Sequence, residues 1–300
     1  MYFFFVFFVD INKMKRVVID TDPALGCPGR DVDDGLALFL ALNSPELEVE
    51  AITITYGNVS LKNALRSAHK ITSFLKKEEI PIYTGAASPR YLGKTSEAAE
   101  RLIHLFSRNP EEVSLLAIGP LTNIATVEKI EPGTLRRLRE VVIMGGAVYR
   151  RGIVPPFFRA EFNFWCDPSA AEIVLRSGAN ISLFPLDVTC KVVFGKKEMK
   201  KIRSSKTAAG EYLRRNLVLW YWMNKVFTRS DGFHPHDPIA AAYLIEPELF
   251  RLKELCLDIY TSGISKGGIS ITPEGAPIKV ALDVDRTQFL KLLLNTILVS

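Results

Sequence analysis

The stretch VVIDTDPALGCPGRDVDDGLALFLAL, residues 17–42, decides how the rest of the chain is interpreted. Apolar residues lead into Asp20 and Asp22, and a turn containing Gly and Pro follows. From Leu36 onward, apolar residues recur at helical spacing. This pattern is typical of a buried strand, a loop and an amphipathic helix.

Five aspartates gather where the predicted strand ends and the predicted helix begins: Asp20, Asp22, Asp31, Asp33 and Asp34. That many carboxylates cannot all stay ionised at close range without a compensating charge. A divalent cation would supply that charge, and ligands that are all oxygen suit Ca²⁺ or Mg²⁺. The alternative is a helix N-cap by Asp31 or Asp33 with solvated neighbours, but capping needs one or two acids rather than five.

Predicted strands and helices alternate along almost the whole chain. The strands are expected at residues 48–56, 113–118, 140–144, 181–186, 254–261 and 278–284. The helices are expected at residues 60–77, 97–107, 167–176, 196–204, 207–228, 238–245 and 286–298. This alternation favours an α/β fold with an open, mostly parallel, doubly wound sheet. Since no linker, low-complexity run or repeat interrupts it, a single domain is the simplest organisation.

Composition narrows the class of protein. Of 300 residues, 48% are hydrophobic, enough for a large core, and the formal charge of +5 is spread along the chain. No basic patch requires nucleic acid. The four cysteines, Cys27, Cys166, Cys190 and Cys256, lack metal-ligand or redox spacing, so a reduced cytoplasmic protein is expected, with a disulfide as the alternative.

The first nine residues, MYFFFVFFV, are strongly apolar but too short to span a bilayer. They lack the basic start and the small-residue cleavage site of a signal peptide. We therefore expect residues 1–13 to be an apolar N-terminal extension, either a mis-assigned start or a segment docked on the surface. Residues 14–300 would form the functional domain, and no membrane partner is expected.

A set of short motifs occurs in an order similar to that of the inosine–uridine-preferring nucleoside hydrolases. The motifs are DTDP (20–23), DDG (33–35), GN (57–58), GPLTNIA (119–125), VIMGG (142–146), AEFN (160–163), DP (167–168) and HDP (236–238). The resemblance covers roughly residues 16–298. It implies that the single domain hydrolyses the N-glycosidic bond of ribonucleosides, giving free base and ribose.

The resemblance also implies a cofactor and a partner. Ca²⁺ would be bound by Asp22, Asp34, Asp237 and the backbone carbonyl of Ile118, and Asp22 would accept a proton from the water that the metal holds. The substrate would be a small-molecule nucleoside, and the protein a homodimer or homotetramer. Asp237 could instead cap a helix that starts at Pro238.

Substrate contacts follow from the same resemblance. The ribose would be bound by Asp33, Asn58, Met144, Glu161, Phe162 and Asn163. Carboxylates beneath a ribosyl group stabilise the positive charge of an oxocarbenium-like transition state. His236 is the candidate acid for the leaving base, and His234 is a weaker one.

Three departures from the family pattern stand out. The loop of residues 24–32 is longer than usual and adds Asp31. Asp31, Asp33 and Asp34 are therefore all candidate metal ligands. Asp34 fits the order of the family motif best. Residues 154–159 lack the Asn expected for the ribose 5′-hydroxyl, and residues 88–97 lack a His. Purine or pyrimidine preference therefore stays open. Three aromatic residues could either stack on the base or simply pack within the helix: Tyr221, Trp222 and Phe227.

Two other functions remain as alternatives. VVIDTD resembles the start of haloacid-dehalogenase-type phosphatases, in which Asp20 would be the nucleophile and Asp22 the acid, with Mg²⁺. Ala24 replaces the usual Thr or Val of that motif, and the AEFN segment has no place in it. A non-catalytic protein of the same fold that binds nucleosides or ribose is the second alternative.

Overall fold

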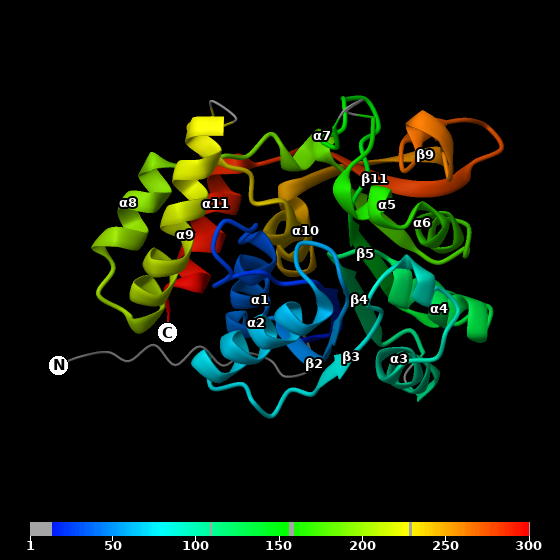
Figure 1. The fold of residues 1–300 in the computed structure, drawn as a ribbon, viewed down its shortest axis with the longest axis horizontal. Helices are drawn as coiled ribbons and strands as arrows, with labels where there is room; N and C mark the ends of the chain where they lie inside the picture. Colours follow the sequence, from blue (N-terminus) through cyan, green and yellow to red (C-terminus); the bar gives the residue numbers. More distant parts are fainter. Residues whose placement is uncertain (1–13, 109, 156–158, 228–229, 300) are drawn as a thin grey trace.

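The computed structural model describes residues 14–108, 110–155, 159–227 and 230–299. A nine-stranded sheet forms its centre (Figure 1). The strands are β1 (Lys15–Thr21), β2 (Leu47–Ile54), β3 (Ile82–Thr84), β4 (Val113–Ala117), β5 (Glu140–Met144), β6 (Ile181–Phe184), β9 (Phe250–Ile259), β10 (Ile269–Ile271) and β11 (Ala276–Val284). The predicted extension, residues 1–13, lies outside the described residues.

The strand order is β10-β9-β11-β6-β5-β4-β1-β2-β3. Every pair from β11 to β3 is parallel, while β9 pairs antiparallel with both β11 and β10. The order reverses around β1, which lies between β2 and β4. An open parallel sheet binds ligands outside the carboxyl ends of its strands at such a point. The predicted mostly parallel sheet is confirmed.

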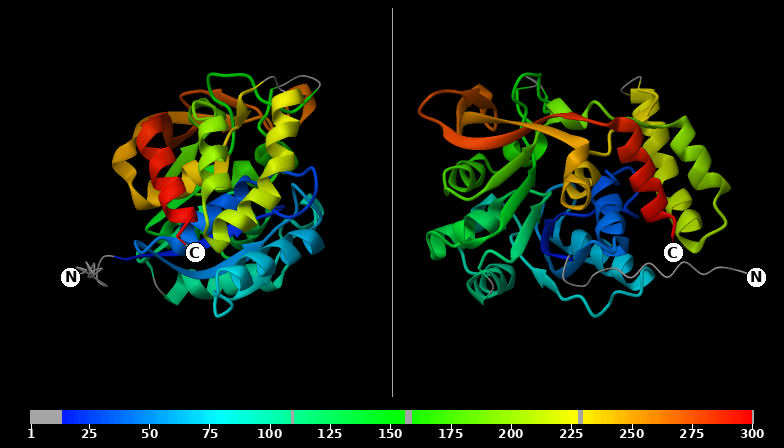
Figure 2. Two further views of the ribbon diagram at one scale, coloured as in Figure 1. Left: turned by 90° about the vertical axis from the view of Figure 1, so that its left-hand side faces the viewer. Right: turned by 180° about the vertical axis from the view of Figure 1, so that it is seen from behind.

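Helices cover both faces of this sheet (Figures 1 and 2). One face carries α1 (Asp33–Asn43), α2 (Leu61–Phe74), α7 (Leu186–Thr189), α8 (Lys196–Ser204), α9 (Ala208–Phe227), α10 (His236–Ile245) and α11 (Arg286–Ile297). The other face carries α3 (Glu97–Arg108), α4 (Thr122–Ile130), α5 (Phe162–Cys166) and α6 (Pro168–Leu175). Short 3₁₀ turns occur at Pro89–Tyr91, Leu135–Arg137, Pro247–Leu249 and Gly263–Ser265, and β7 (Phe194–Gly195) pairs with β8 (Gly232–Phe233). Two apolar cores therefore fill the space on either side, as a doubly wound single domain requires.

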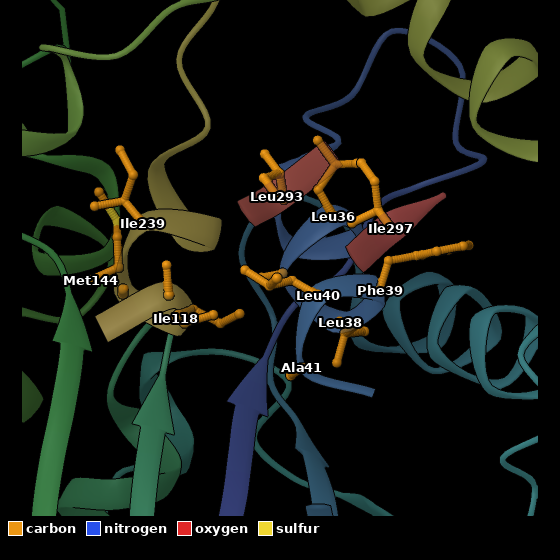
Figure 3. Close-up of a cluster of buried hydrophobic side chains, with 14 of the residues drawn as sticks. Leu36, Leu38, Phe39, Leu40, Ala41, Ile118, Met144, Ile239, Leu293 and Ile297 are labelled. Carbon is orange, nitrogen blue, oxygen red and sulfur yellow. The ribbon is translucent and has the colours of Figure 1, made fainter. Parts of the chain in front are cut away.

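Helix α1 is the central helix of the larger core. Figure 3 shows Leu36 of α1 beside Leu293 and Ile297 of α11, while Phe39 and Leu40 point to opposite sides of α1. Every residue of α1 except its last is buried. The prediction of an amphipathic helix was therefore wrong, because a helix packed on all sides is apolar all round. Its burial also carries the two acids of its first turn into the protein interior.

The structure departs from the predicted elements at several places. β6 stops at Phe184, and α7 starts at Leu186, where the sequence suggested a continuing strand. α5 was not predicted, and neither was the edge strand β10. α10 starts at His236 rather than Pro238. Pro238 lacks an N–H, but it fits in the first turn of the helix because N–H groups there have no acceptor within the helix. In the part of the chain that the structure describes, none of the helices has the length and apolarity needed to cross a bilayer.

Candidate active site

A pocket of ≈ 510 Å³ opens at the carboxyl ends of the central parallel strands. Residues after β2 and β4 supply Asn58 and Ile118, and the last residue of β5 is Met144, so the sheet forms the floor. Loops and helices outside the sheet form the walls. The wall residues are Gly29, Arg30, Ile153, Val154, Pro155, Phe162, Trp165, Leu186, Trp220 and His236.

Three carboxylates converge at the floor. One oxygen from each of Asp33, Asp34 and Asp237 lies within 4.8 Å of the other two. Asp33 and Asp34 belong to the first turn of α1, and Asp237 belongs to the first turn of α10. Because these two helices pack together, acids about 200 positions apart in the chain become neighbours. Asp237 is inside its helix rather than at the N-cap, and its N–H donates to Asp33 Oδ2 over 3.3 Å.

Asp22 lies behind this trio at the end of the β1 strand. Its Oδ2 accepts the backbone N–H of Asn58, at 2.5 Å, and its backbone N–H donates to Asp34 Oδ1, at 3.2 Å. Asp34 Oδ1 also accepts the Thr21 hydroxyl, at 2.6 Å, and Asp34 Oδ2 accepts the side-chain amide of Asn58, at 2.7 Å. The predicted metal ligands Asp34 and Asp237 therefore approach each other, and Asp22 lies beside Asp34. The third acid of the close group is Asp33, which was predicted to bind ribose, and not Asp22.

The charge of the cluster is strongly unfavourable. Burial, reinforced by neighbouring aspartates, raises the pKa of Asp22, Asp33 and Asp237 well above the usual value. Burial also raises the pKa of Asp34 to about 6, although the Thr21 hydroxyl bond opposes the shift. Such a group of acids is stable in the ionised form only beside a positive charge.

The donor set fits a hard divalent cation. Within the described residues, Oδ1 of Asp22 is buried and has no hydrogen-bond partner, so it keeps a full capacity to bind a cation. A Cβ at Gly119 would lie 2.7 Å from this Oδ1, and a Cβ at Gly57 would lie 2.2 Å from Oδ2. Glycine at both positions keeps the space around the carboxylate open. The acidic cluster can therefore hold a metal.

Asp31 lies next to Asp33 at the start of α1. Its Oδ1 accepts the backbone N–H of Val32, at 2.7 Å, and that of Asp33, at 3.4 Å. This contact resembles a cap, although the N-cap position itself is Val32. Asp31 lines the pocket, but it lies outside the group of three oxygens that approach one another.

Glu161 and Asn163 lie at the start of α5, a short helix that was not predicted from the sequence. Glu161 is the N-cap of α5, and it accepts the N–H groups of Asn163, at 2.7 Å, and Phe164, at 3.1 Å. It also accepts the N–H of Gly146, at 3.0 Å, so one carboxylate joins the β5 end to α5. Burial raises its pKa, and these backbone bonds oppose the shift.

Asn163 points its side-chain amide at two strand ends. The amide donates to the carbonyl oxygens of Ile118, at 3.2 Å, and Met144, at 3.3 Å. The carbonyl predicted as a metal ligand therefore already faces the pocket floor. Figure 3 shows Ile118 and Met144 beside Ile239 at the top of the sheet, where the core ends and the pocket begins.

His236 is half-buried in the pocket wall next to Asp237. Its Nδ1 lies 2.7 Å from the hydroxyl of Thr189 on α7. Burial, with added repulsion from His234 and Arg150, lowers the pKa of His236 to about 3. The imidazole is therefore neutral near pH 7. His234 lies 5.6 Å from it, ring to ring, and contacts the Val192 carbonyl instead.

Asp20 is sealed from the pocket. It is completely buried, and its Oδ2 accepts the Thr53 hydroxyl, at 2.6 Å, and the Asn123 amide, at 2.8 Å. Burial raises its pKa to about 7. A nucleophile must reach its substrate, so this placement argues against the phosphatase alternative. It suits an acid that holds β1 against β2.

The aromatic residues of the wall differ from those named from the sequence. Trp220 and Trp165 line the pocket, whereas Tyr221 is buried and Trp222 is exposed outside it. The side chain of Phe227 lies outside the described part. Since Trp220, Tyr221 and Trp222 are consecutive, only the rotation of α9 decides which one faces the pocket.

Comparisons with known proteins agree with this arrangement. Residues 17–291 match the family model described as inosine-uridine preferring nucleoside hydrolase. A probable uridine nucleosidase 1 of Oryza sativa subsp. japonica is 31% identical, over 84% of this chain and 83% of the relative. A plant nucleoside hydrolase, PpNRh1, is 29% identical with a TM-score of 0.87, over 95% and 99%. A purine-preferring ribonucleoside hydrolase from Gardnerella vaginalis is 27% identical with a TM-score of 0.85, over 94% and 98%.

Proposed function

The chain belongs to the inosine-uridine preferring nucleoside hydrolase family and is a ribonucleoside hydrolase, and from this premise we propose how its residues divide the work. The cofactor is Ca²⁺, bound by Asp22, Asp34, Asp237 and the carbonyl of Ile118. Asp22 is the base that activates water. The observation that carries this proposal is the buried Asp22 oxygen without a partner beside three converging carboxylates.

Bound Ca²⁺ would supply a Lewis acid that lowers the pKa of water and orients ribose hydroxyls. Asp22 accepts the proton of the attacking water. The water oxygen forms a bond to C1′ of the ribose as the N-glycosidic bond breaks, and the electron pair of that bond passes to the base. Ionised carboxylates beneath the sugar stabilise its transient positive charge.

Other floor residues, together with Phe162 of the wall, bind the ribose. Asp33 and Asn58 accept and donate hydrogen bonds at the 2′- and 3′-hydroxyls, and Glu161 and Asn163 do so on the other side of the ring. Met144 lies beneath the ring, and Phe162 covers it with an apolar face. All six side chains line the pocket, which supports these roles.

His236 contacts the leaving base in the neutral state. A pKa near 3 leaves too little imidazolium at neutral pH for a strong acid, but a neutral ring still has one N–H to donate. Thr189 would hold the ring so that one nitrogen faces the pocket. A homo-oligomeric assembly, which the resemblance implies, and a cytoplasmic location, which the cysteine spacing suggests, stay predictions.

Ribose release from a panel of ribonucleosides tests this function. The panel contains inosine, adenosine, uridine and cytidine, with the enzyme assayed after dialysis against EGTA and again after addition of Ca²⁺ or Mg²⁺. We expect release of ribose and free base that EGTA abolishes and Ca²⁺ restores. Binding of nucleosides without any turnover would favour the non-catalytic alternative, and full activity after exhaustive chelation would exclude the metal.

A further inference from the structure

The loop of residues 24–32 brings one permanent cation to the pocket. Arg30 is the one arginine or lysine among the described residues that line it. Neighbouring Asp31 directs its carboxylate to the start of α1. In the part of the chain that the structure describes, no ion pair or side-chain hydrogen bond engages the Arg30 guanidinium. The positive charge of Arg30 has no role in the mechanism proposed above.

The loop that carries Arg30 is anchored on both sides. The Ser67 hydroxyl on α2 donates to the Leu25 carbonyl, at 2.8 Å. On the other side the loop packs against α9, since a Cβ at Gly26 would lie 3.5 Å from Asn216 Oδ1, and a Cβ at Gly29 would lie 3.5 Å from Met223 Sδ. The anchored backbone of the loop therefore places Arg30 at the rim of the pocket, with its side chain exposed.

Arg30 shares a wall with an aromatic ring. Trp220 falls between Asn216 and Met223 on α9, and it lines the pocket as Arg30 does. A nucleoside whose ribose occupies the acidic floor presents its base to the walls. An indole surface and a guanidinium together suit a flat base that accepts hydrogen bonds, because indole packs on rings and guanidinium only donates.

We propose that Arg30 donates hydrogen bonds to a carbonyl oxygen of the leaving base and stabilises the negative charge that the base acquires. The electron pair of the broken N-glycosidic bond passes to the base nitrogen and is delocalised onto that oxygen. A guanidinium that donates to this oxygen lowers the energy of the charge at the moment it forms. Arg30 is thus a specificity residue that favours bases with an oxo group over bases with an amino group at the same position. This inference rests on the proposed function.

The test compares substrates that differ in the leaving group. Arg30→Gln is assayed with inosine against adenosine, and with uridine against cytidine, using whichever pairs the wild-type protein hydrolyses. The third kind of substrate is 4-nitrophenyl β-D-ribofuranoside, because its phenolate leaves as a stable anion without assistance. The matched control is Arg66→Gln, since Arg66 lines a second cavity together with Arg30 but does not line the pocket.

We expect Arg30→Gln to lower kcat/KM about 100-fold on the oxo member of a pair, as loss of one preorganised donor does. The loss on the amino member should be about ten times smaller, and the nitrophenyl substrate should change by less than about 3-fold. Retained nitrophenyl turnover also shows that the variant is folded. Arg66→Gln should behave as the wild type on all substrates.

Two results would overturn the inference. An equal loss on oxo, amino and nitrophenyl substrates would mean that Arg30 only offsets the charge of the floor acids. An unchanged rate with the oxo substrate would mean that it does not meet the base. A wild-type protein that releases ribose from no substrate would instead refute the proposed function, before Arg30 is considered.

Discussion

The floor and the wall of the pocket are held by different kinds of structure. Floor residues sit at strand ends or in first helical turns, and hydrogen bonds such as Asp34 to Thr21 and Asn58 tie them to one another. Wall residues come mainly from the loops at 24–32 and 148–155 and from α9. If the proposed roles hold, bond cleavage depends on residues that the sheet positions. The choice of base would then depend on wall segments, which can vary in sequence without disturbing the sheet.

Each region has its own anchor. The floor is anchored by the packing of α1 against α10, which brings Asp33 and Asp34 to Asp237. The loop at 148–155 is anchored by one carboxylate, because Asp187 accepts the N–H groups of Val148 and Tyr149, at 2.7 and 2.8 Å, and of Arg150. Removing a floor acid should therefore stop the reaction, whereas removing a wall anchor should weaken substrate binding.

The largest effect is expected at Asp22. Asp22→Asn keeps an acceptor for the Asn58 N–H but removes the proton acceptor, so kcat should fall about 10³-fold or more. Because one of several repelling buried acids disappears, the Tm in EGTA should stay the same or rise. Ribose release and thermal melting measure both. Asp283→Asn, at an exposed ion pair with Lys191, is the control, and wild-type turnover in Asp22→Asn would contradict the assignment.

Without its metal, the floor should make the free energy of unfolding depend on pH, and we expect this effect to be of intermediate size. Burial raises the folded-state pKa of Asp34 to about 6 and that of Asp20 to about 7, above the unfolded value near 4. The folded protein thus binds more protons than the unfolded chain between these values, so stability falls as pH rises from about 4 to about 7.

In EGTA we expect the free energy of unfolding to be at least about 2 kcal/mol lower at pH 8 than at pH 5. Ca²⁺ should restore the share of this loss that comes from the floor acids, since a bound cation stabilises them in the ionised form, but not the share that comes from Asp20. Urea unfolding at the two pH values measures the difference, and Asp34→Asn should reduce it. A flat profile in EGTA would show that the floor acids are not mutually destabilised.

The smallest effect is expected in the wall. Asp187→Ala removes the acceptor of three backbone N–H groups and loosens the segment that carries Ile153, Val154 and Pro155 into the pocket. The KM for a nucleoside should rise about 10-fold, which corresponds to about 1.4 kcal/mol, while kcat changes by less than about 3-fold. Steady-state kinetics separate the two terms. A large fall in kcat at constant KM would instead mean that Asp187 supports bond cleavage, as the floor residues do, and not substrate binding.

The sequence by itself determined the sheet and the identity of the floor acids. Alternating strands and helices require parallel crossovers, and the polar residues at strand ends must then share one edge. This is why Asp22 and Asn58 could be placed at one edge of the sheet from the pattern alone, whereas the Ile118 carbonyl was named only through the family resemblance. Local patterns sufficed because strand ends and helix starts are set by neighbours in the chain.

Only the tertiary structure decided which side chains form the wall and how the acids are partnered. Helical spacing cannot tell which of Trp220, Tyr221 and Trp222 faces the pocket, because that depends on how α9 is rotated against the loop at 24–32. Likewise, α5 exists because buried Glu161 caps it, and Arg30 reaches the pocket because its loop is held between α2 and α9. These outcomes follow from packing between segments distant in sequence, and no local pattern encodes such contacts.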